Sequence, residues 1–242
     1  MRRLVLLLAV MALGLVLASG GVLAVNRIGT NGPGTLKGTN GADSLLGKGG
    51  NDDLFGLGGR DNLLGGDGKD WVLGGNEQRL LGGDNNLVGG SGNDGAQSGR
   101  GSDSVLGGSG NDFVTGDNGS HNVVGEEGMG LVDGGQGSDR VVGGDGPDLL
   151  VGGTFGDTSK DDTLSGGDGD DAFFVDNGPA TRDKVSCGRG FDRVAADTKD
   201  VVAPDCEQVR RGPTAGEKLN EYLEASGFFE DLFEGLASFP EV

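Results

Sequence analysis

The chain has 242 residues, of which 54 are glycine, six are proline and one is histidine. Glycine does not recur at every third position and proline is scarce, which excludes collagen. With 38 acidic against 19 basic residues, the net charge of −19 disfavours nucleic acids and anionic lipids as partners and favours cations. Hydrophobic residues make up 34% of the chain, so a conventional core is not expected unless cations neutralise the carboxylates.

Residues 1–24 are predicted to be a secretory signal peptide. A basic start, Met1-Arg2-Arg3, precedes an apolar stretch over residues 4–17, and small residues precede a cleavage site after Ala24. The alternative is an uncleaved membrane anchor, because the uncharged stretch up to Val25 is long enough to span a bilayer. The small residues favour cleavage, which predicts a secreted, extracellular protein without stable membrane insertion. Residues 25–37 then form an N-terminal lead-in.

A nine-residue repeat begins at Gly38. Its first units are GTNGADSLL, GKGGNDDLF, GLGGRDNLL and GGDGKDWVL, and it continues to Ala195 in 13 full-length units. Position 4 is always glycine, and position 6 is aspartate except at His121 and Gly130. Position 8 is Leu, Val or Phe except at Ala96. Three columns in phase indicate one structural unit repeated along the chain.

These columns predict an all-β fold over residues 38–195. Glycines at positions 1, 2 and 4 allow the first six residues to form a tight loop, whereas the last three are extended. Position 8 then points inward, because neighbouring side chains of a strand face opposite sides. Two units form one coil of a parallel β-roll, or β-solenoid. Nearly nine coils would stack at the strand spacing to a length of about 40 Å.

The aspartates at position 6 are the predicted metal ligands. Loops on one side of the roll recur every 18 residues, so Asp43 should stack over Asp61, Asp52 over Asp70, and Asp94 over Asp112. Such carboxylates repel one another unless an ion lies between successive loops, bound by aspartate oxygens and by carbonyls of the glycine turns. Six to eight oxygens at irregular angles suit Ca²⁺ better than Mg²⁺, and no Cys/His cluster is present for zinc. The candidate ligands of several calcium ions are Asp43, Asp52, Asp61, Asp70, Asp94, Asp103, Asp112, Asp139, Asp148, Asp162 and Asp171.

Two stretches of the predicted roll are irregular. Residues 74–88 are shorter than two units and carry Arg79 near an aspartate position, so we expect the register to break there and the roll to split into two blocks. Around residues 152–165 the insertion FGDTSK is expected to disturb the coil that follows Asp139 and Asp148. We therefore expect Asp52→Ala to lower calcium affinity more than Asp148→Ala. His121 and Gly130 are expected to weaken their loops.

The recurring pattern GGxGxDxUx resembles that of the RTX, or haemolysin-type, calcium-binding repeats. The resemblance covers about two thirds of the chain. It implies a parallel β-roll with Ca²⁺ between adjacent coils, unfolded or loose without calcium and folding as calcium binds. The alternative is a disordered glycine-rich linker, but a linker does not need a column of aliphatic residues.

The C-terminal part contains the two cysteines and an acidic segment. Cys187 and Cys206 are expected to form a disulfide between the last coil and a cap at residues 196–212, with two free thiols as the alternative. Residues 213–242 begin with a capping box and predict an acidic amphipathic helix. This helical tail could cover an open end of the roll, which we favour, or it could dock a partner or serve as an export signal.

These features favour a non-enzymatic, calcium-binding extracellular protein with a structural, adhesive or calcium-buffering role and a partner, extracellular or on a cell surface, that the sequence does not identify. Two alternatives stay open. A secreted RTX-type enzyme or toxin would need a catalytic or pore-forming domain, and neither HExxH nor GxSxG occurs. A β-solenoid that binds ice or another surface would need a row of like residues, whereas positions 7 and 9 mix residue types.

Overall fold

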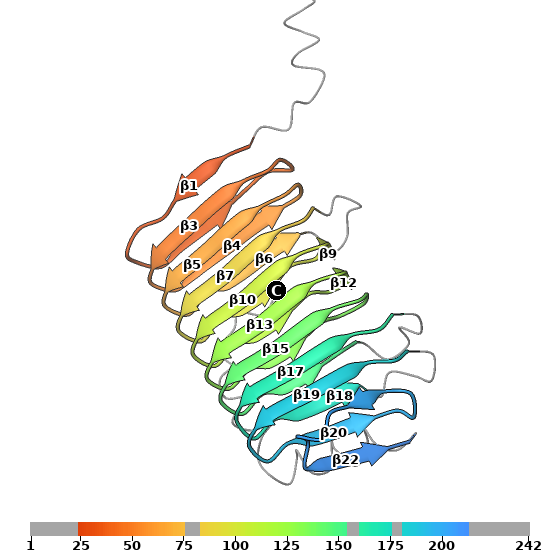
Figure 1. The fold of residues 1–242 in the computed structure, drawn as a ribbon. Coiled ribbons are helices and arrows are strands. Elements are labelled where there is room, and N and C mark those ends of the chain that lie inside the picture. The colour runs from red at the N-terminus through yellow and green to blue at the C-terminus, as the bar shows by residue number, and fades with distance from the viewer. Residues whose placement is uncertain (1–23, 76–82, 154–159, 176–180, 213–242) are drawn as a thin grey trace, which may run out of the picture.

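The computed structural model describes residues 24–75, 83–153, 160–175 and 181–212. These residues form a stack of coils made of strands and turns, which is a parallel β-solenoid without helices (Figure 1). The predicted signal peptide up to residue 23, Arg79, most of the FGDTSK insertion and the predicted helical tail lie outside the described residues. Within the described ranges no helix has the length and apolarity needed to cross a membrane.

One parallel sheet of ten strands, the first sheet, forms one wall of the roll (Figure 1). Its strands, in spatial order, are β1 (Asn26–Ile28), β3 (Ser44–Gly49), β5 (Asn62–Asp67), β7 (Asn86–Ser91), β10 (Ser104–Ser109), β13 (Asn122–Glu127), β15 (Arg140–Asp145), β17 (Thr163–Asp168), β19 (Lys184–Arg189) and β21 (Val201–Val202).

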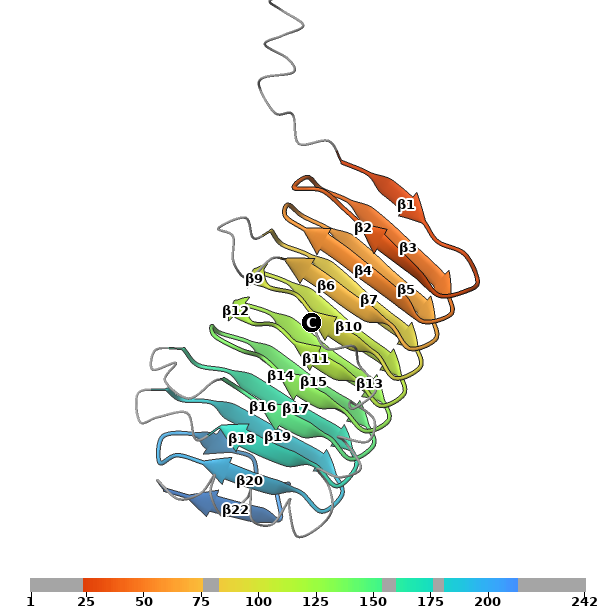
Figure 2. The same ribbon diagram turned by 180° about the vertical axis from the view of Figure 1, so that it is seen from behind.

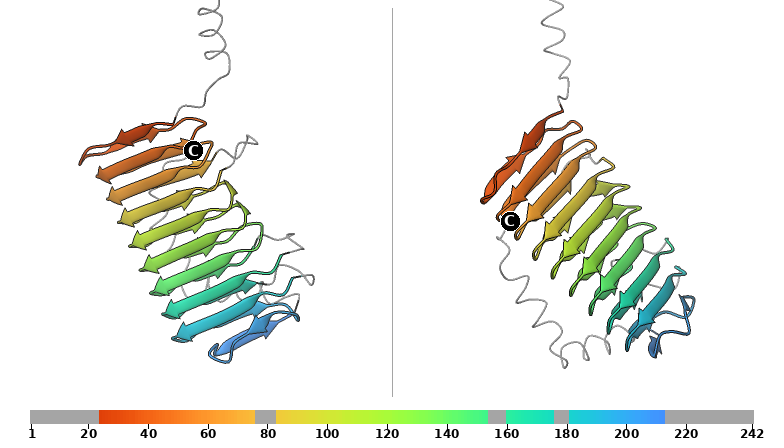
Figure 3. Two further views of the ribbon diagram at one scale, coloured as in Figure 1. Left: turned by 45° about the horizontal axis from the view of Figure 1, so that its top comes forward. Right: turned by 60° about the vertical axis from the view of Figure 1, so that its left-hand side comes forward.

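A second parallel sheet of ten strands forms the opposite wall (Figure 2). It contains β2 (Gly34–Lys37), β4 (Asp52–Leu57), β6 (Trp71–Gly75), β8 (Gly95–Gln97), β11 (Phe113–Thr115), β14 (Leu131–Asp133), β16 (Leu149–Val151), β18 (Ala172–Val175), β20 (Arg193–Ala196) and β22 (Gln208–Arg211). The short strands β9 (Arg100–Gly101) and β12 (Asn118–Gly119) pair with each other at one edge. The chain alternates between the two walls, so each coil contributes one strand to each sheet (Figure 3).

The core is a thin column of side chains between the two sheets, as the repeat predicts. Position 8 supplies it in every described unit. Leu45, Leu63 and Val105 face the core from the first sheet, and Leu54 and Val114 face it from the second. These five residues are at most 1% exposed. Burial of one aliphatic side chain per unit therefore accounts for a fold with so few hydrophobic residues.

The strands are longer than the sequence predicts. In the first sheet, strands such as β5 run through positions 7–9 and on into positions 1–3 of the next unit, which leaves only a three-residue turn before β6. Position 2 requires a left-handed backbone, as at Gly66 with φ 119°. Lys48 and Glu126 occupy the same position with φ 90°. The prediction of a six-residue loop is therefore wrong, because the parallel ladder extends into the glycines.

The register does not break at residues 74–88. Strand β5 pairs with β7, so that Leu63 lies beside Leu87, and β6 pairs with β8. The coil is enlarged instead, and equivalent residues lie 24 positions apart rather than 18. Asn85 occupies the aspartate position that the irregular sequence concealed. The prediction of two separate blocks is therefore wrong, because the extra residues leave the stack at a turn rather than displacing a strand.

Extra residues enter the roll at one edge only. Enlarged coils have spacings of 24, 23 and 21 residues. In each case the extra residues come after a second-sheet strand (β6, β16 or β18) and before the next first-sheet strand. We call this the variable edge. At the opposite edge, the regular edge, each of the turns from β5 to β20 that lead from the first to the second sheet leaves three residues between the strands (Figures 1 and 2).

The predicted disulfide is present. Cys187, which is fully buried in β19, is bonded to Cys206 across a separation of 19 residues. The bond joins the last long strand of the first sheet to the segment that carries β21 and β22. The cap predicted at residues 196–212 consists of these two edge strands and the turn between them.

Candidate metal centre

Nearly every turn ends in a buried polar side chain at position 6, immediately before a strand; the exceptions are Gly130 and the exposed Glu207. Along each edge these side chains stack one above another, and we call each stack a ladder. The variable-edge ladder consists of Asp43, Asp61, Asn85, Asp103, His121, Asp139, Asp162, Asp183 and Asp200. The regular-edge ladder consists of Asp52, Asp70, Asp94, Asp112, Gly130, Asp148, Asp171, Asp192 and Glu207.

One oxygen of each ladder carboxylate accepts a hydrogen bond from a backbone N–H. Oδ1 of Asp70 accepts the backbone N–H of Asp52 at 2.8 Å, and Oδ1 of Asp94 accepts that of Asp70 at 2.7 Å. The same bond links Asp94 to Asp112 at 2.8 Å. The stacking predicted for Asp43 over Asp61, Asp52 over Asp70 and Asp94 over Asp112 is thus confirmed. These bonds orient each carboxylate identically, coil after coil.

The second carboxylate oxygen has no such partner. Several Oδ2 atoms are buried and accept no hydrogen bond from the residues that the structure describes. They belong to Asp52, Asp61, Asp70, Asp94, Asp112, Asp148, Asp171 and Asp192. Burying a carboxylate oxygen that accepts no hydrogen bond costs free energy, so a row of such oxygens favours the binding of cations. The aspartates at position 6 therefore fit the calcium ions that the repeat predicts.

Glycine at position 1 makes room for these oxygens. A Cβ atom placed on Gly89 would lie 2.6 Å from Oδ2 of Asp94 and 2.6 Å from the carbonyl oxygen of Gly107. A Cβ atom on Gly107 would meet Oδ2 of Asp112 at 2.5 Å and the carbonyl oxygen of Gly125 at 2.7 Å. A carboxylate oxygen and a carbonyl oxygen of the next coil therefore converge where the glycine lacks a side chain. Both are hard oxygen donors of the kind that Ca²⁺ takes.

Burial shifts the titration of the regular-edge ladder. Desolvation, joined by the neighbouring carboxylates of Asp112 and Asp171 and opposed by backbone N–H bonds, raises the pKa of Asp94 and of Asp148 to about 8. Desolvation likewise raises the pKa of Asp70 to about 6 and those of Asp112 and Asp171 to about 7. Without a cation these groups would hold protons near neutrality, and a bound cation would displace them.

Side chains alone do not complete a metal site. Among the described residues, no three acidic, histidine or cysteine side chains gather closely enough to hold an ion. Each interval between coils offers two stacked carboxylates. The remaining ligands of a Ca²⁺ ion must therefore be backbone carbonyls or water, as the glycine-rich turns allow.

The outermost positions of the variable-edge ladder satisfy both carboxylate oxygens within the protein. Asp43 accepts hydrogen bonds from the backbone N–H and the hydroxyl of Thr39. At the other end, Asp200 accepts the backbone N–H of Asp183 at 3.0 Å and that of Asp197 at 2.8 Å. These residues end the ladder without requiring a further ion.

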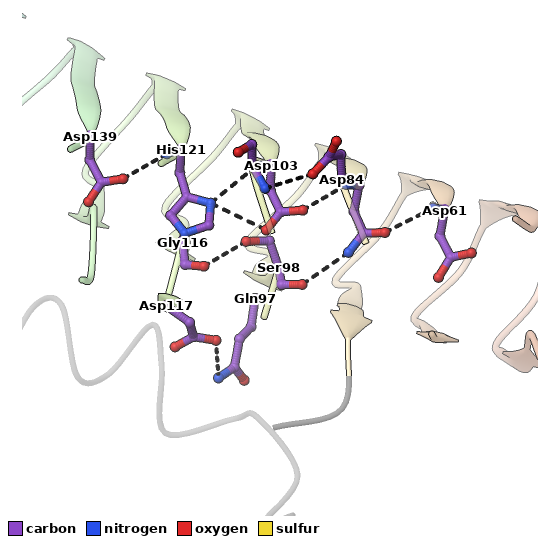
Figure 4. A network of polar contacts seen from close by, with 11 residues as sticks. Asp61, Asp84, Gln97, Ser98, Asp103, Gly116, Asp117, His121 and Asp139 are labelled. Carbon is purple, nitrogen blue, oxygen red and sulfur yellow. Dashed lines mark hydrogen bonds and ion pairs between the residues drawn. The ribbon is translucent and has the colours of Figure 1, made fainter. Parts of the chain in front are cut away.

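Three residues alter the middle of the variable-edge ladder (Figure 4). Asn85 accepts the backbone N–H of Asp61 at 2.8 Å and donates from Nδ2 to the carbonyl oxygen of Ser98 at 3.2 Å. Ser98 stands at position 1 and donates its hydroxyl to the carbonyl oxygen of Gly116 at 2.8 Å. The amide of Asn85 and the hydroxyl of Ser98 thus donate hydrogen bonds at positions where the repeat has an aspartate and a glycine, and where a cation would otherwise be needed.

His121 is the third of these residues, and it is 4% exposed. Its Nδ1 lies 3.2 Å from the backbone nitrogen of Asp103 and 3.2 Å from Oδ2 of Asp103 (Figure 4). An unprotonated Nδ1 accepts from the first, and a protonated one donates to the second. The imidazole therefore occupies the space that an aspartate at this position would fill with a carboxylate whose second oxygen lacks a hydrogen-bond donor. In the regular-edge ladder, Gly130 instead leaves the N–H of Asp112 to bond the carbonyl oxygen of Met129 at 3.2 Å.

The insertion near residue 155 does not disturb the ladders. Oδ1 of Asp171 accepts the N–H of Asp148 at 2.9 Å, and Oδ1 of Asp162 accepts that of Asp139 at 2.8 Å. The reason for ranking Asp52→Ala above Asp148→Ala is therefore wrong, because each of the two aspartates has an intact acidic neighbour in the following coil.

Sequence reasoning missed five ladder residues: Asn85, Asp183, Asp192, Asp200 and Glu207. Asp192 lies in the unit CGRGFDRVA, where the repeat alone could have identified it. Asn85 could have been found only by allowing an insertion of arbitrary length before GGDNNLV. Asp200 and Glu207 follow no repeat, and only the stacking of the cap places them.

The fold and the two ladders define a class: parallel β-solenoids whose glycine-rich turns present stacked carboxylates to cations. The comparison with protein families shows which family of this class the chain belongs to. The RTX calcium-binding nonapeptide repeat matches residues 28–63, 46–78, 81–114, 96–120, 133–154 and 157–179, more than half of the chain. The chain belongs to this family, as the pattern GGxGxDxUx indicates. No curated protein matches the chain.

Proposed function

We propose that the chain is a secreted calcium-binding scaffold whose turns hold several Ca²⁺ ions between successive coils. The position-6 aspartates, together with turn carbonyls, would be the ligands. The observation that carries this proposal is the row of buried Oδ2 atoms without donors in the regular-edge ladder. The chemistry that the bound ions supply is charge neutralisation, which offsets the cost of burying aspartates in successive coils.

The regular edge would bind calcium more strongly than the variable edge. On the regular edge, Asp52, Asp70, Asp94 and Asp112 follow one another without interruption, and the turns from β5 to β20 keep one length. On the variable edge, Asn85 and His121 stand on either side of Asp103. An interval between an aspartate and an asparagine or histidine offers one carboxylate instead of two, so it attracts a divalent cation less.

A structural or adhesive role is proposed over an enzymatic one. The repeat family accounts for most of the described roll. A disulfide between Cys187 and Cys206 suits an oxidising, extracellular compartment and supports secretion. The aspartates recur once per turn in like environments, whereas acid–base catalysis uses paired groups held in different environments.

A calcium titration followed by circular dichroism tests this function, with Mg²⁺ at equal concentration as the ionic control. We expect a cooperative gain of β signal with calcium alone. A chain that is fully folded in chelator and unchanged by calcium would contradict the proposal. Glu127→Gln is the matched control, because it removes an exposed carboxylate outside the ladders and should leave the titration unchanged.

One observation favours a second candidate function, the binding of an ordered surface. On the outer face of the first sheet, position 9 is aliphatic in seven successive coils: Ile28, Leu46, Leu64, Val88, Leu106, Val124 and Val142. Beside it, position 7 is polar, and Nδ2 of Asn86 donates to Oδ1 of Asn62 at 2.9 Å. The mixture of residue types at positions 7 and 9 therefore gives uniform rows on the first sheet, whereas the second sheet keeps mixed residue types there.

Such flat rows, repeated at the strand spacing, suit a polysaccharide or a crystalline surface. An ice-recrystallisation assay and a polysaccharide pull-down test this candidate, with Leu64→Asp as the variant and Ser109→Asp, at an exposed position outside the rows, as the charge-matched control. Binding that Leu64→Asp abolishes would support it. Retention of binding by Leu64→Asp would exclude this face.

A further inference from the structure

Several residues of the second sheet point away from the core and are nevertheless buried. Leu149, Ala172 and Ala195 alternate with core residues along β16, β18 and β20, so their side chains face outward. Their exposed fractions are 4%, 3% and 0%, and they form a small apolar cluster separate from the core. Leu131, Val151 and Phe174 pack against this cluster and are partly buried.

The first sheet provides the comparison. None of the outward residues at positions 7 and 9 of its described strands is buried, and Leu64 and Val201 are 38% and 42% exposed. In the second sheet, none of the equivalent residues between Gly95 and Ala195 is exposed. The two outer faces therefore differ although one repeat builds both. This low exposure indicates that a further segment covers the outer face of the second sheet over β8 to β20.

No described element provides this cover. The described strands lie beside the cluster in the same sheet or across the core from it (Figures 2 and 3). Asp133, which also faces outward from this sheet, supports the presence of a cover. Burial raises the pKa of its carboxyl although Oδ1 accepts the backbone N–H of Gly135 at 2.9 Å.

We propose that residues 213–242 of the same chain dock on this face, with their apolar side packed against the Leu149 cluster. The chain leaves the described structure at Gly212, directly after β22, the last strand of the second sheet. Gly212 has φ 115°, a conformation that glycine adopts readily and that can reverse the chain direction before Pro213. Residues 1–23, by contrast, precede β1 at the other end of the first sheet.

The composition of this segment matches the face. Its apolar residues recur at helical spacing, whereas seven acidic residues against one lysine would face solvent. The apolar residues at that spacing are Leu219, Tyr222, Leu223, Phe229, Leu232, Phe233 and Leu236. Thirty residues would span up to about 45 Å as a helix. The five strands from β11 to β20 rise only about 20 Å at the strand spacing, so the segment is long enough to cover them.

Site-specific photo-crosslinking in the full chain tests this docking. A benzophenone amino acid replaces Leu131 on the second sheet or Leu106 at the outer face of the first, both partly exposed. We expect cross-linked peptides from position 131 to map to residues 213–242 of the same molecule, and position 106 to give none there. Cross-links from position 131 to residues 1–23, to a second copy of the chain or to nothing at all would overturn the proposal.

A second measurement does not depend on labelling. The double variant Leu223→Glu/Phe233→Glu places charges on the apolar side of the segment, and Glu224→Gln/Glu234→Gln is the matched control on the polar side. We expect the first to increase binding of an apolar fluorescent dye severalfold at saturating calcium, with an unchanged β signal, and the control to change neither. Equal dye binding by both double variants would contradict the docking.

Discussion

The two edges of the roll use the same nine-residue repeat, but only one keeps it strictly. On the regular edge the turns from β5 to β20 each leave three residues between the strands, and the ladder departs from acidic residues only at Gly130. The variable edge takes in all the extra residues and carries Asn85, Ser98 and His121 in its middle. An ion between turns needs carbonyls at fixed positions, so turns of constant length suit ion binding. On the variable edge the extra residues leave the stack without displacing the ladder, even between the aspartates Asp139, Asp162 and Asp183.

The largest effect is expected from closing the space beside a regular-edge carboxylate. Gly89→Ala would place a methyl group 2.6 Å from both Oδ2 of Asp94 and the carbonyl oxygen of Gly107. Overpacking of this kind costs about 1–3 kcal/mol, which corresponds to a fall in Tm of roughly 5–10 °C in calcium. Differential scanning calorimetry measures the shift.

Gly49→Ala is the control for this substitution. A Cβ atom on Gly49 would meet its nearest neighbours at 3.8 Å, which is ordinary contact. Its Tm should therefore stay close to that of the parent chain. An equal fall in Tm for the two variants would mean that the position-1 glycines are needed only for the backbone conformation and do not make space for an ion.

The next effect separates the two ladders directly. Asp94→Ala removes a carboxylate between two aspartates, whereas Asp103→Ala removes one between Asn85 and His121. We expect Asp94→Ala to raise the calcium midpoint about tenfold, which corresponds to about 1.4 kcal/mol, and Asp103→Ala to raise it less than threefold. Isothermal calorimetry measures both, and a larger shift for Asp103→Ala would reverse the assignment of the stronger edge.

A pH dependence follows from the raised pKa values. Desolvation raises the pKa of Asp94 to about 8 and that of Asp112 to about 7, against about 3.9 for an unfolded aspartate. Between about pH 4 and 8 the folded, calcium-free chain therefore binds more protons than the unfolded chain. Its free energy of unfolding should fall as the pH rises through this window.

Calcium should abolish most of this fall and release protons as it binds below about pH 8. Urea unfolding in chelator at pH 5, 6, 7 and 8 measures the slope. Asp94→Asn should flatten it, because the carboxyl with a strongly raised pKa is gone. A stability that rises with pH in chelator would show that the ladder carboxylates are not desolvated.

The smallest effect is expected from restoring the repeat on the variable edge. Asn85→Asp would continue the aspartates from Asp61 to Asp103 but lose the donor to the carbonyl oxygen of Ser98. We expect a loss of about 1 kcal/mol of stability in chelator and partial recovery in calcium. Chemical denaturation in both conditions measures the difference. A gain of stability in chelator would mean that the amide of Asn85 does not replace an ion.

Much of the fold could be predicted because the repeat is local. Glycine at position 4, aspartate at position 6 and an aliphatic residue at position 8 act within one turn and one strand, so the sequence predicts each coil from its own residues. The stacking of Asp52 over Asp70 follows from the 18-residue period alone. The enlarged coil before Asn85 could not be predicted, because only pairing of β5 with β7 shows how many residues a turn can release without shifting a strand.

The sequence by itself determined the β-roll, its acidic turns and the pairing of Cys187 with Cys206. Each of these follows from residues that recur at fixed spacing or, for the cysteines, from an even count. Only the tertiary structure separated the two edges and the two outer faces, because units nine residues apart lie on opposite walls and look alike in sequence. Strand pairing assigns each unit to its wall. It thereby shows the nearly continuous carboxylates of the regular edge, the amide and imidazole of the variable edge, and the buried outward side chains around Leu149.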